Sequence, residues 1–209
     1  MKRRTAGFTL LELAVSTGLL GLVVGSALAM SMAGRNAFTQ ANASVSANAK
    51  VRRALERAVS ELNWAGADTL SNCSAGASTV SFQPLESVAG GVAIWGPTRR
   101  LQLVPSANDP DDGIDNDGDG VIDECDLVLT IDVGGAGERS ITLCTQVTEM
   151  FPGETLNGLD DNGNAIVDER GFNVESVGDF LTVRLSVAEP GENDRTTASS
   201  ITTSITLRN

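Results

Sequence analysis

A long apolar run stands near the start of the chain. Residues 13–34 carry no charged side chain. These 22 residues are enough for a helix to cross a bilayer, which takes about 20 residues. Lys2, Arg3 and Arg4 precede the run, and by the positive-inside rule they stay in the cytoplasm. We therefore predict a membrane helix over residues 8–34 that leads into an exported region.

A second helical pattern follows the apolar run. From residue 35 to residue 64 the chain has neither proline nor glycine. Apolar residues recur there at spacings of four, four and three, namely at Val51, Leu55, Val59 and Leu62. This spacing is typical of an amphipathic helix. We predict that residues 35–66 form the amphipathic half of the same helix and pack onto a sheet.

The remaining residues, 67–209, contain short β-prone runs separated by turn residues. The runs on either side of the glycine-rich segment 134–137 predict one hairpin, and the last two runs predict another. A long helix on an antiparallel sheet belongs to the α+β class. The predicted strands span residues 79–85, 92–95, 99–104, 127–133, 140–147, 180–188 and 200–207.

The acidic residues are concentrated in two segments. The net charge is −12, and of 27 acidic residues nine lie in residues 108–126 and five in residues 154–170. The rest of the chain is nearly neutral, so we expect no nucleic-acid partner. The chain also lacks histidine and tyrosine, which removes the commonest general base and the commonest transition-metal ligand. We predict that the protein is not an enzyme.

The two acidic segments contain an internal repeat, because residues 113–124 recur 45 positions later as residues 158–169. In the first copy Asp115, Asp117 and Asp119 alternate with other residues before Gly120. Such alternation winds three oxygen ligands around one ion, and the glycine permits a sharp turn.

Further ligands are predicted at the end of the first copy. The carbonyl group of Val121 and the carboxylate of Asp123 or Glu124 would complete the shell, while Ile122 would anchor the loop to the core. The second copy offers fewer carboxylates and should bind an ion more weakly. Its candidate ligands are Asp160, Asn162, Asn164, Asp168 and Glu169. Six to eight oxygen ligands suit calcium better than magnesium, so we expect one or two calcium ions.

The spacing of both copies resembles the DxDxDG calcium loops of dockerin modules and thrombospondin type 3 repeats, and more distantly the EF-hand. Neither copy has the glutamate that closes an EF-hand loop, because Asp126 and Gly171 stand there. The alternative interpretation is a pair of disordered acidic linkers. Since the acidic side chains of the first copy would repel one another, we favour liganded loops. The chain runs from the first copy along a strand, round the hairpin turn and back to the second copy, so we expect both loops at one end of the sheet.

A carboxylate interrupts the start of the apolar run at Glu12. A carboxylate near the membrane costs on the order of 1 to 3 kcal/mol, so Glu12 requires a partner. The surrounding residues, Gly7-Phe8-Thr9-Leu10-Leu11-Glu12-Leu13, resemble the prepilin cleavage and methylation motif of type IV pilins and type II secretion pseudopilins.

The resemblance implies a specific processing and assembly route. A prepilin peptidase would remove residues 1–7 by cutting between Gly7 and Phe8 and would methylate the new amine. Glu12 would then pair with the Phe8 amine of a neighbouring subunit. Many major pilins carry a proline within the apolar segment, whereas the first proline here is Pro84. A minor pilin or a pseudopilin is therefore expected. Its head, residues 67–209, would lie in the periplasm while the helix is in the inner membrane, or in an extracellular filament after assembly.

Two questions remain open at the level of sequence. Cys73, Cys125 and Cys144 allow one disulfide, and the predicted hairpin register slightly favours a bond from Cys73 to one of the other two. The alternative to a filament subunit is a membrane-tethered, calcium-dependent binding or adhesion module that does not polymerise.

Overall fold

The computed structural model describes residues 9–191 and 196–207. The predicted leader, residues 1–7, and the predicted mature N-terminus at Phe8 lie outside the described residues. The chain divides into two compact units, Met1–Ala41 and Asn42–Asn209.

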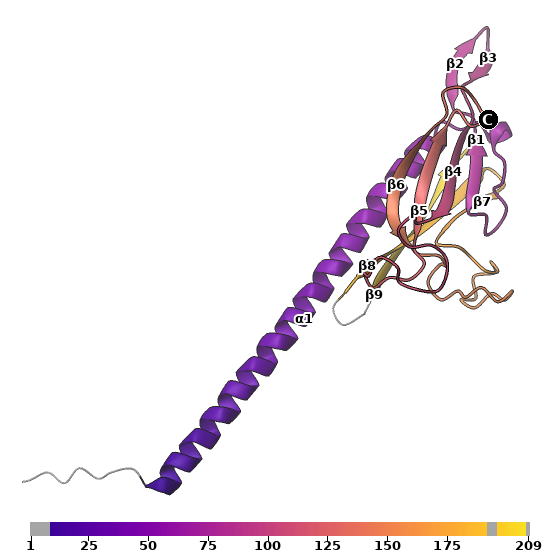
Figure 1. Cartoon of the computed structure of the whole chain (residues 1–209). Helices are drawn as coiled ribbons and strands as arrows, with labels where there is room; N and C mark the ends of the chain where they lie inside the picture. The colour runs from indigo at the N-terminus through magenta and orange to yellow at the C-terminus, as the bar shows by residue number, and fades with distance from the viewer. Residues whose placement is uncertain (1–8, 192–195, 208–209) are drawn as a thin grey trace, which may run out of the picture. The chain divides into compact units, whose positions relative to one another are not determined.

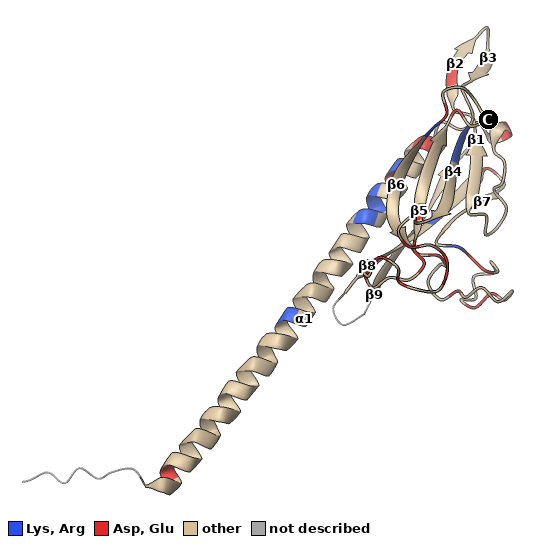
Figure 2. Cartoon of the chain, in the orientation of Figure 1, with Lys and Arg blue, Asp and Glu red and all other residues tan. Residues whose placement is uncertain are grey.

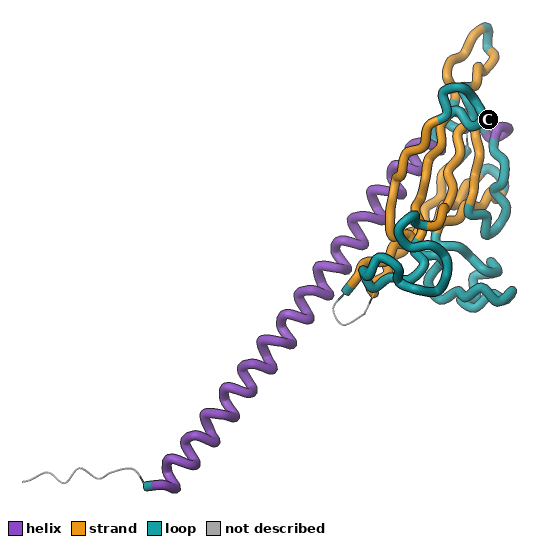
Figure 3. Tube along the Cα trace, in the orientation of Figure 1, coloured by secondary structure: helices purple, strands orange, loops and turns teal. Residues whose placement is uncertain are grey.

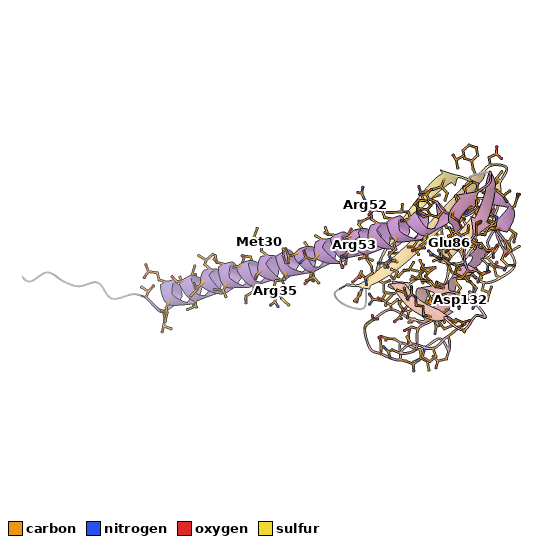
Figure 4. The ribbon with its side chains drawn as sticks, turned by 90° about the horizontal axis from the view of Figure 1, so that it is seen from above. Met30, Arg35, Arg52, Arg53, Glu86 and Asp132 are labelled. Carbon is orange, nitrogen blue, oxygen red and sulfur yellow. The ribbon has the colours of Figure 1, made fainter. Side chains whose placement is uncertain are left out.

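Helix α1 spans Leu10–Leu62 without interruption, so the predicted apolar and amphipathic segments form one helix of 53 residues (Figure 1). Its part within the first unit exposes all of its side chains, including large apolar ones such as Leu22 and Met32. Met30 and Arg35 project from the helix in the side-chain view (Figure 4). By length and composition α1 could cross a membrane.

The second unit contains the C-terminal part of α1, a seven-stranded sheet and a separate hairpin. This arrangement confirms the predicted α+β class. The sheet has the order β1-β4-β5-β6-β8-β7, with β9 also paired to β8, and all of these pairs are antiparallel. The strands are β1 (Thr79–Phe82), β4 (Arg99–Pro105), β5 (Cys125–Ile131), β6 (Arg139–Val147), β7 (Phe172–Val177), β8 (Phe180–Pro190) and β9 (Thr196–Thr206).

Both predicted hairpins are present, as β5–β6 and β8–β9. The predicted strand over residues 79–85 was too long, because β1 ends at Phe82 and Pro84 forms an isolated bridge with Ala65. After this break the separate hairpin begins with β2 (Leu85–Ala89) and returns as β3 (Val92–Trp95). Neither β2 nor β7 was predicted as a strand of its own.

The core lies between α1 and the sheet. Seven side chains of α1 are buried, and five of them belong to this core, namely Val51, Ala54, Leu55, Ala58 and Leu62. They belong to one hydrophobic cluster with buried strand residues such as Phe82, Leu129 and Leu185. Val59 is only partly buried, whereas Ala54 and Ala58 are buried. The buried stripe of the helix is therefore shifted from Val59 toward these two alanines. Apolar burial of this kind is the main favourable term in folding.

The two acidic segments connect the strands at one end of the sheet. Cys125 at the start of β5 pairs with Val147 at the end of β6, so the loop before β5 and the loop after β6 are neighbours. Both loops lie at the end away from the β2–β3 hairpin (Figures 1 and 3). The predicted placement of the two repeats at a common end is therefore confirmed. We call residues 108–126 loop one and residues 154–170 loop two.

Candidate functional site

Loop one brings the three alternating aspartates together. Oxygen atoms of Asp115, Asp117 and Asp119 all lie within 4.8 Å of one another. Asp115 orders the loop, because its Oδ1 accepts a hydrogen bond from Gly118 N (2.6 Å) and its Oδ2 accepts one from Gly120 N (2.9 Å). This cluster could hold a metal ion. Acidic residues, coloured red, lie in both loops (Figure 2).

Loop two repeats the backbone of loop one. Asp160 accepts hydrogen bonds from Gly163 N (2.7 Å) and Ala165 N (2.7 Å), as Asp115 does 45 residues earlier. Ala165 adopts a φ of 69°, close to the 89° of Gly120. A positive φ is unfavourable for alanine, so the hydrogen bonds that loop two shares with loop one hold Ala165 in a strained conformation.

Asp123 and Asp168 close the two loops through backbone hydrogen bonds. Asp123 Oδ1 accepts from Asp112 N and Gly113 N, each at 2.9 Å. Asp168 accepts from Asn157 N (2.8 Å) and from the amide of the following glycine. These carboxylates therefore brace the start of each loop against its end. They are not part of the cluster of Asp115, Asp117 and Asp119, which we call the aspartate ring.

The residue that anchors loop one differs from the predicted one. Ile122 is 58% exposed, whereas Val121 is only 6% exposed. Loop two shows the same pattern, because Ile166 is buried and Val167 is exposed. Asp123 adopts a positive φ, which turns the chain directly after Ile122. The side chain of Val121 therefore points into the core, and that of Ile122 does not.

Four buried carboxylates are found among the described residues, and all belong to the two loops. They are Asp109, Glu124, Glu154 and Glu169. Glu124 and Glu169 were predicted as ligands, but Asp109 and Glu154 were not. The repeat of 45 residues extends back to them, because Asp109 Oδ1 accepts from Asn116 N (2.7 Å) and Glu154 Oε1 accepts from Asn162 N (2.9 Å).

The buried pair in loop one has unusual proton affinities. Burial, and then the neighbouring Asp109 carboxyl group, raise the pKa of Glu124 to about 8. The hydrogen bond from Glu124, and then the one from the Asn116 amide, hold the pKa of Asp109 below its ordinary value. Glu124 Oε2 is buried and has no N–H or O–H donor. A cation bound beside this pair would remove the repulsion between the two carboxylates.

Loop one is connected to the helix through β6. Asp119 Oδ2 accepts a hydrogen bond from Gln146 Nε2 (2.5 Å), and Gln146 Oε1 accepts one from Lys50. Lys50 also forms an ion pair with Glu189 in β8. Gln146 adopts a φ of 57°, which places its side chain away from the regular strand pattern. Gln146, the hydrogen-bond donor to Asp119, is thus held by the core of the second unit.

A second acidic cluster lies beside the first. Oxygen atoms of Asp111, Asp123 and Glu149 lie within 4.8 Å of one another. Glu149 already forms an ion pair with Arg170, and Asp123 accepts backbone amides as described above. These partners offset much of the charge, so this cluster is the weaker candidate for a cation.

Glu12 lies in the first turn of α1 and forms a capping box with Thr9. Glu12 Oε2 accepts from Thr9 N and from Thr9 Oγ1, each at 2.9 Å, and Glu12 N donates to Thr9 Oγ1 (3.2 Å). A capping box satisfies amides that a helix terminus leaves unpaired. The Glu12 carboxylate therefore has a local role that was not predicted, although the spacing of Thr9 and Glu12 is the signature of a capping box.

All three cysteines are free thiols in the structure. Cys125 and Cys144 are buried in the same hydrophobic cluster, and Cys73 packs against it. Burial raises the pKa of Cys125 to about 12 and that of Cys144 to about 11. A disulfide from Cys73 to one of them stays a prediction for the exported protein.

Comparison of the chain with protein-family models, with curated proteins and with solved structures found no match.

Proposed function

We propose that this protein is a subunit of a membrane-assembled filament, a minor pilin or a type II secretion pseudopilin, with a head stabilised by calcium. One observation carries the proposal. The part of α1 before residue 42 exposes its apolar side chains on every face and contains a single carboxylate, Glu12, in its first turn. Such a helix needs either lipid or other apolar helices around it.

The proposed assembly uses Glu12 and the amine of processed Phe8. In the bilayer, the attraction between a carboxylate and an ammonium group is strong because the dielectric constant is low. The capping box keeps the Glu12 carboxylate at the helix terminus, where the amine of an adjacent subunit could reach it. The apolar surface of α1 would then pack against the same surface of other subunits.

Calcium would act on the head alone. The ring of Asp115, Asp117 and Asp119 supplies hard oxygen ligands, which calcium prefers. An ion in loop one would fix the end of the sheet from which β5 begins. The head would then keep its shape after export.

The processing step gives a direct test of the proposal. In cells with a prepilin peptidase, the membrane-extracted protein should begin at Phe8 and carry a methylated amine. Intact-mass measurement with N-terminal sequencing reads both changes. Gly7→Ala is expected to leave the leader attached and serves as the control. Retention of residues 1–7 in the parent protein would refute the family assignment.

A membrane-tethered binding module is the second candidate. The β2–β3 hairpin favours it, because Val88 and Val92 near its tip are 63% and 67% exposed. Exposed apolar side chains on a projecting hairpin are suited to contact with another surface. A tether of this kind needs no processed amine and no Glu12, so variants at these positions separate the two candidates.

A further inference from the structure

The two loops share one backbone but differ in how their buried charge is balanced. In loop one the ring of Asp115, Asp117 and Asp119 is followed by buried Glu124, with buried Asp109 beside it. No ion pair from a lysine or arginine to any of these five carboxylates is present in the described part of the chain. Their partners among the described residues are backbone amides, Gln146 and, for Asp109, the Glu124 carboxyl group.

Glu124 points to a missing positive charge. The residue is 3% exposed, and its Oε2 atom has no hydrogen-bond donor. The carboxyl group interacts with Asp109 and, more weakly, with Asp119 of the ring. A buried carboxylate oxygen without a donor is costly, and it becomes favourable once a cation is bound beside it.

Loop two already contains the groups that replace such a cation. Glu169, the counterpart of Glu124, accepts hydrogen bonds from Asn164 Nδ2 (2.6 Å) and Asn173 Nδ2 (2.8 Å). Arg184 in β8 also forms an ion pair with it, with 3.5 Å between Nε and Oε1. Asn162 and Asn164 stand where loop one has Asp117 and Asp119, so two ring charges are absent as well.

The remaining carboxylates of loop two do not form a cluster. Asp160 accepts three backbone amides, which occupy both of its oxygen atoms. Glu154 is buried with Oε2 unpaired, but a single carboxylate oxygen is a poor site for a divalent ion. Among the described residues, both acidic clusters that could hold a metal use loop one and neither uses loop two.

We propose that loop one binds one calcium ion between the partly exposed aspartate ring and the buried pair Asp109 and Glu124, while loop two keeps the same fold without an ion because Arg184 and asparagine amides balance Glu169. This inference rests on the calcium-stabilised head of the proposed function and names its ligands. The buried pair adds ligands from the protein side, and the ring adds them from the solvent side.

Calorimetric titration of calcium into the full-length protein in detergent, after treatment with a chelator, tests this division. The expected stoichiometry is one ion for each chain. Glu124→Gln should weaken binding at least tenfold, because it removes a ligand charge and keeps the shape. The matched variant in the other loop, Glu169→Gln, should leave the calcium affinity and the stoichiometry unchanged.

Asp109→Asn provides a second variant in case Glu124→Gln does not fold, and circular dichroism establishes that each variant is folded. Parent affinity in folded Glu124→Gln and Asp109→Asn would overturn the assignment of the buried pair. Two bound ions, one of them lost in Glu169→Gln, would overturn the division between the loops. Absence of calcium binding to the parent protein at millimolar concentration would refute both this inference and the calcium part of the proposed function. Filament incorporation is measured separately and would not be affected.

Discussion

Burial controls the chemistry of the thiols in the second unit. Cys125 and Cys144 have pKa values of about 12 and 11, against 9.0 for an ordinary cysteine. The thiolate is the reactive form, so alkylation at pH 8 should be at least about 100-fold slower in the folded protein than in the unfolded chain. Mass spectrometry of the alkylated peptides measures these rates, and equal rates in both states would contradict the buried placement.

The raised pKa values also set a pH dependence with a defined sign. The unfolded thiols ionise near pH 9, whereas the folded ones stay protonated to about pH 11 to 12. Their contribution to stability is complete below pH 9 and is lost as the pH rises through the folded values.

If the exported protein contains the predicted disulfide, two of the three cysteines will resist alkylation after unfolding without a reductant.

Single residues show where sequence reasoning succeeded at the site. The ring of Asp115, Asp117 and Asp119 could be predicted because alternating carboxylates before a glycine have a recognisable spacing. Asp109 was missed because it precedes the ring by six residues and belongs to no such spacing. Extending the 45-residue repeat backward would have aligned it with Glu154. Ile122 was mistaken for the anchor of loop one in place of Val121, because the positive φ of Asp123 cannot be read from a pattern.

At the scale of elements, the helix and both hairpins followed from local patterns. Strand β7 was missed because its residues, Phe172–Val177, contain Asn173 and Glu175, which break the apolar pattern. The structure explains both polar residues, since Arg184 of β8 donates hydrogen bonds to each of them. Pairing with a neighbouring strand decided this segment, and a single sequence does not contain that information.

The loops should couple calcium to the stability of the head. An ion that binds only the folded state adds RT ln(1 + [L]/Kd), which is about 2.7 kcal/mol at a hundredfold excess over Kd. For a unit of this size the melting temperature should rise by roughly 5 to 10 °C in millimolar calcium. Asp117→Ala combined with Asp119→Ala should remove most of this increase, as followed by circular dichroism of the full-length protein.

The matched control removes two exposed carboxylates outside the loops, Glu56→Gln with Glu86→Gln. Glu56 forms only an exposed ion pair with Arg52, which contributes little to stability. This variant should keep the full response to calcium. A melting temperature that is the same in calcium and in chelator for the parent protein would show that the loops are acidic linkers.

At the scale of the whole molecule, the two units carry different requirements. The unit that begins at Asn42 has its own core and buries its apolar side chains. The helical unit before it exposes apolar side chains throughout the described residues. In the proposed filament, lipid and partner helices would surround the first unit only. Glu12 would then be the residue at which lipid insertion and assembly make opposite demands.

Substitution of Glu12 by glutamine separates its two roles. Glutamine can also complete a capping box, so Glu12→Gln should preserve the start of α1 while it removes the charge. Glu12→Ala removes both. If the charge is needed for pairing with the Phe8 amine, both variants should insert and be processed normally but fail to assemble.

Co-purification of each variant with sheared filaments or with partner pseudopilins is the most direct measurement. Glu12→Gln and Glu12→Ala should be absent from the assembled fraction, whereas the control Glu56→Gln should be present at the parental level. Incorporation of both Glu12 variants at the parental level would contradict a role of the Glu12 charge in assembly and favour a tethered module that does not polymerise.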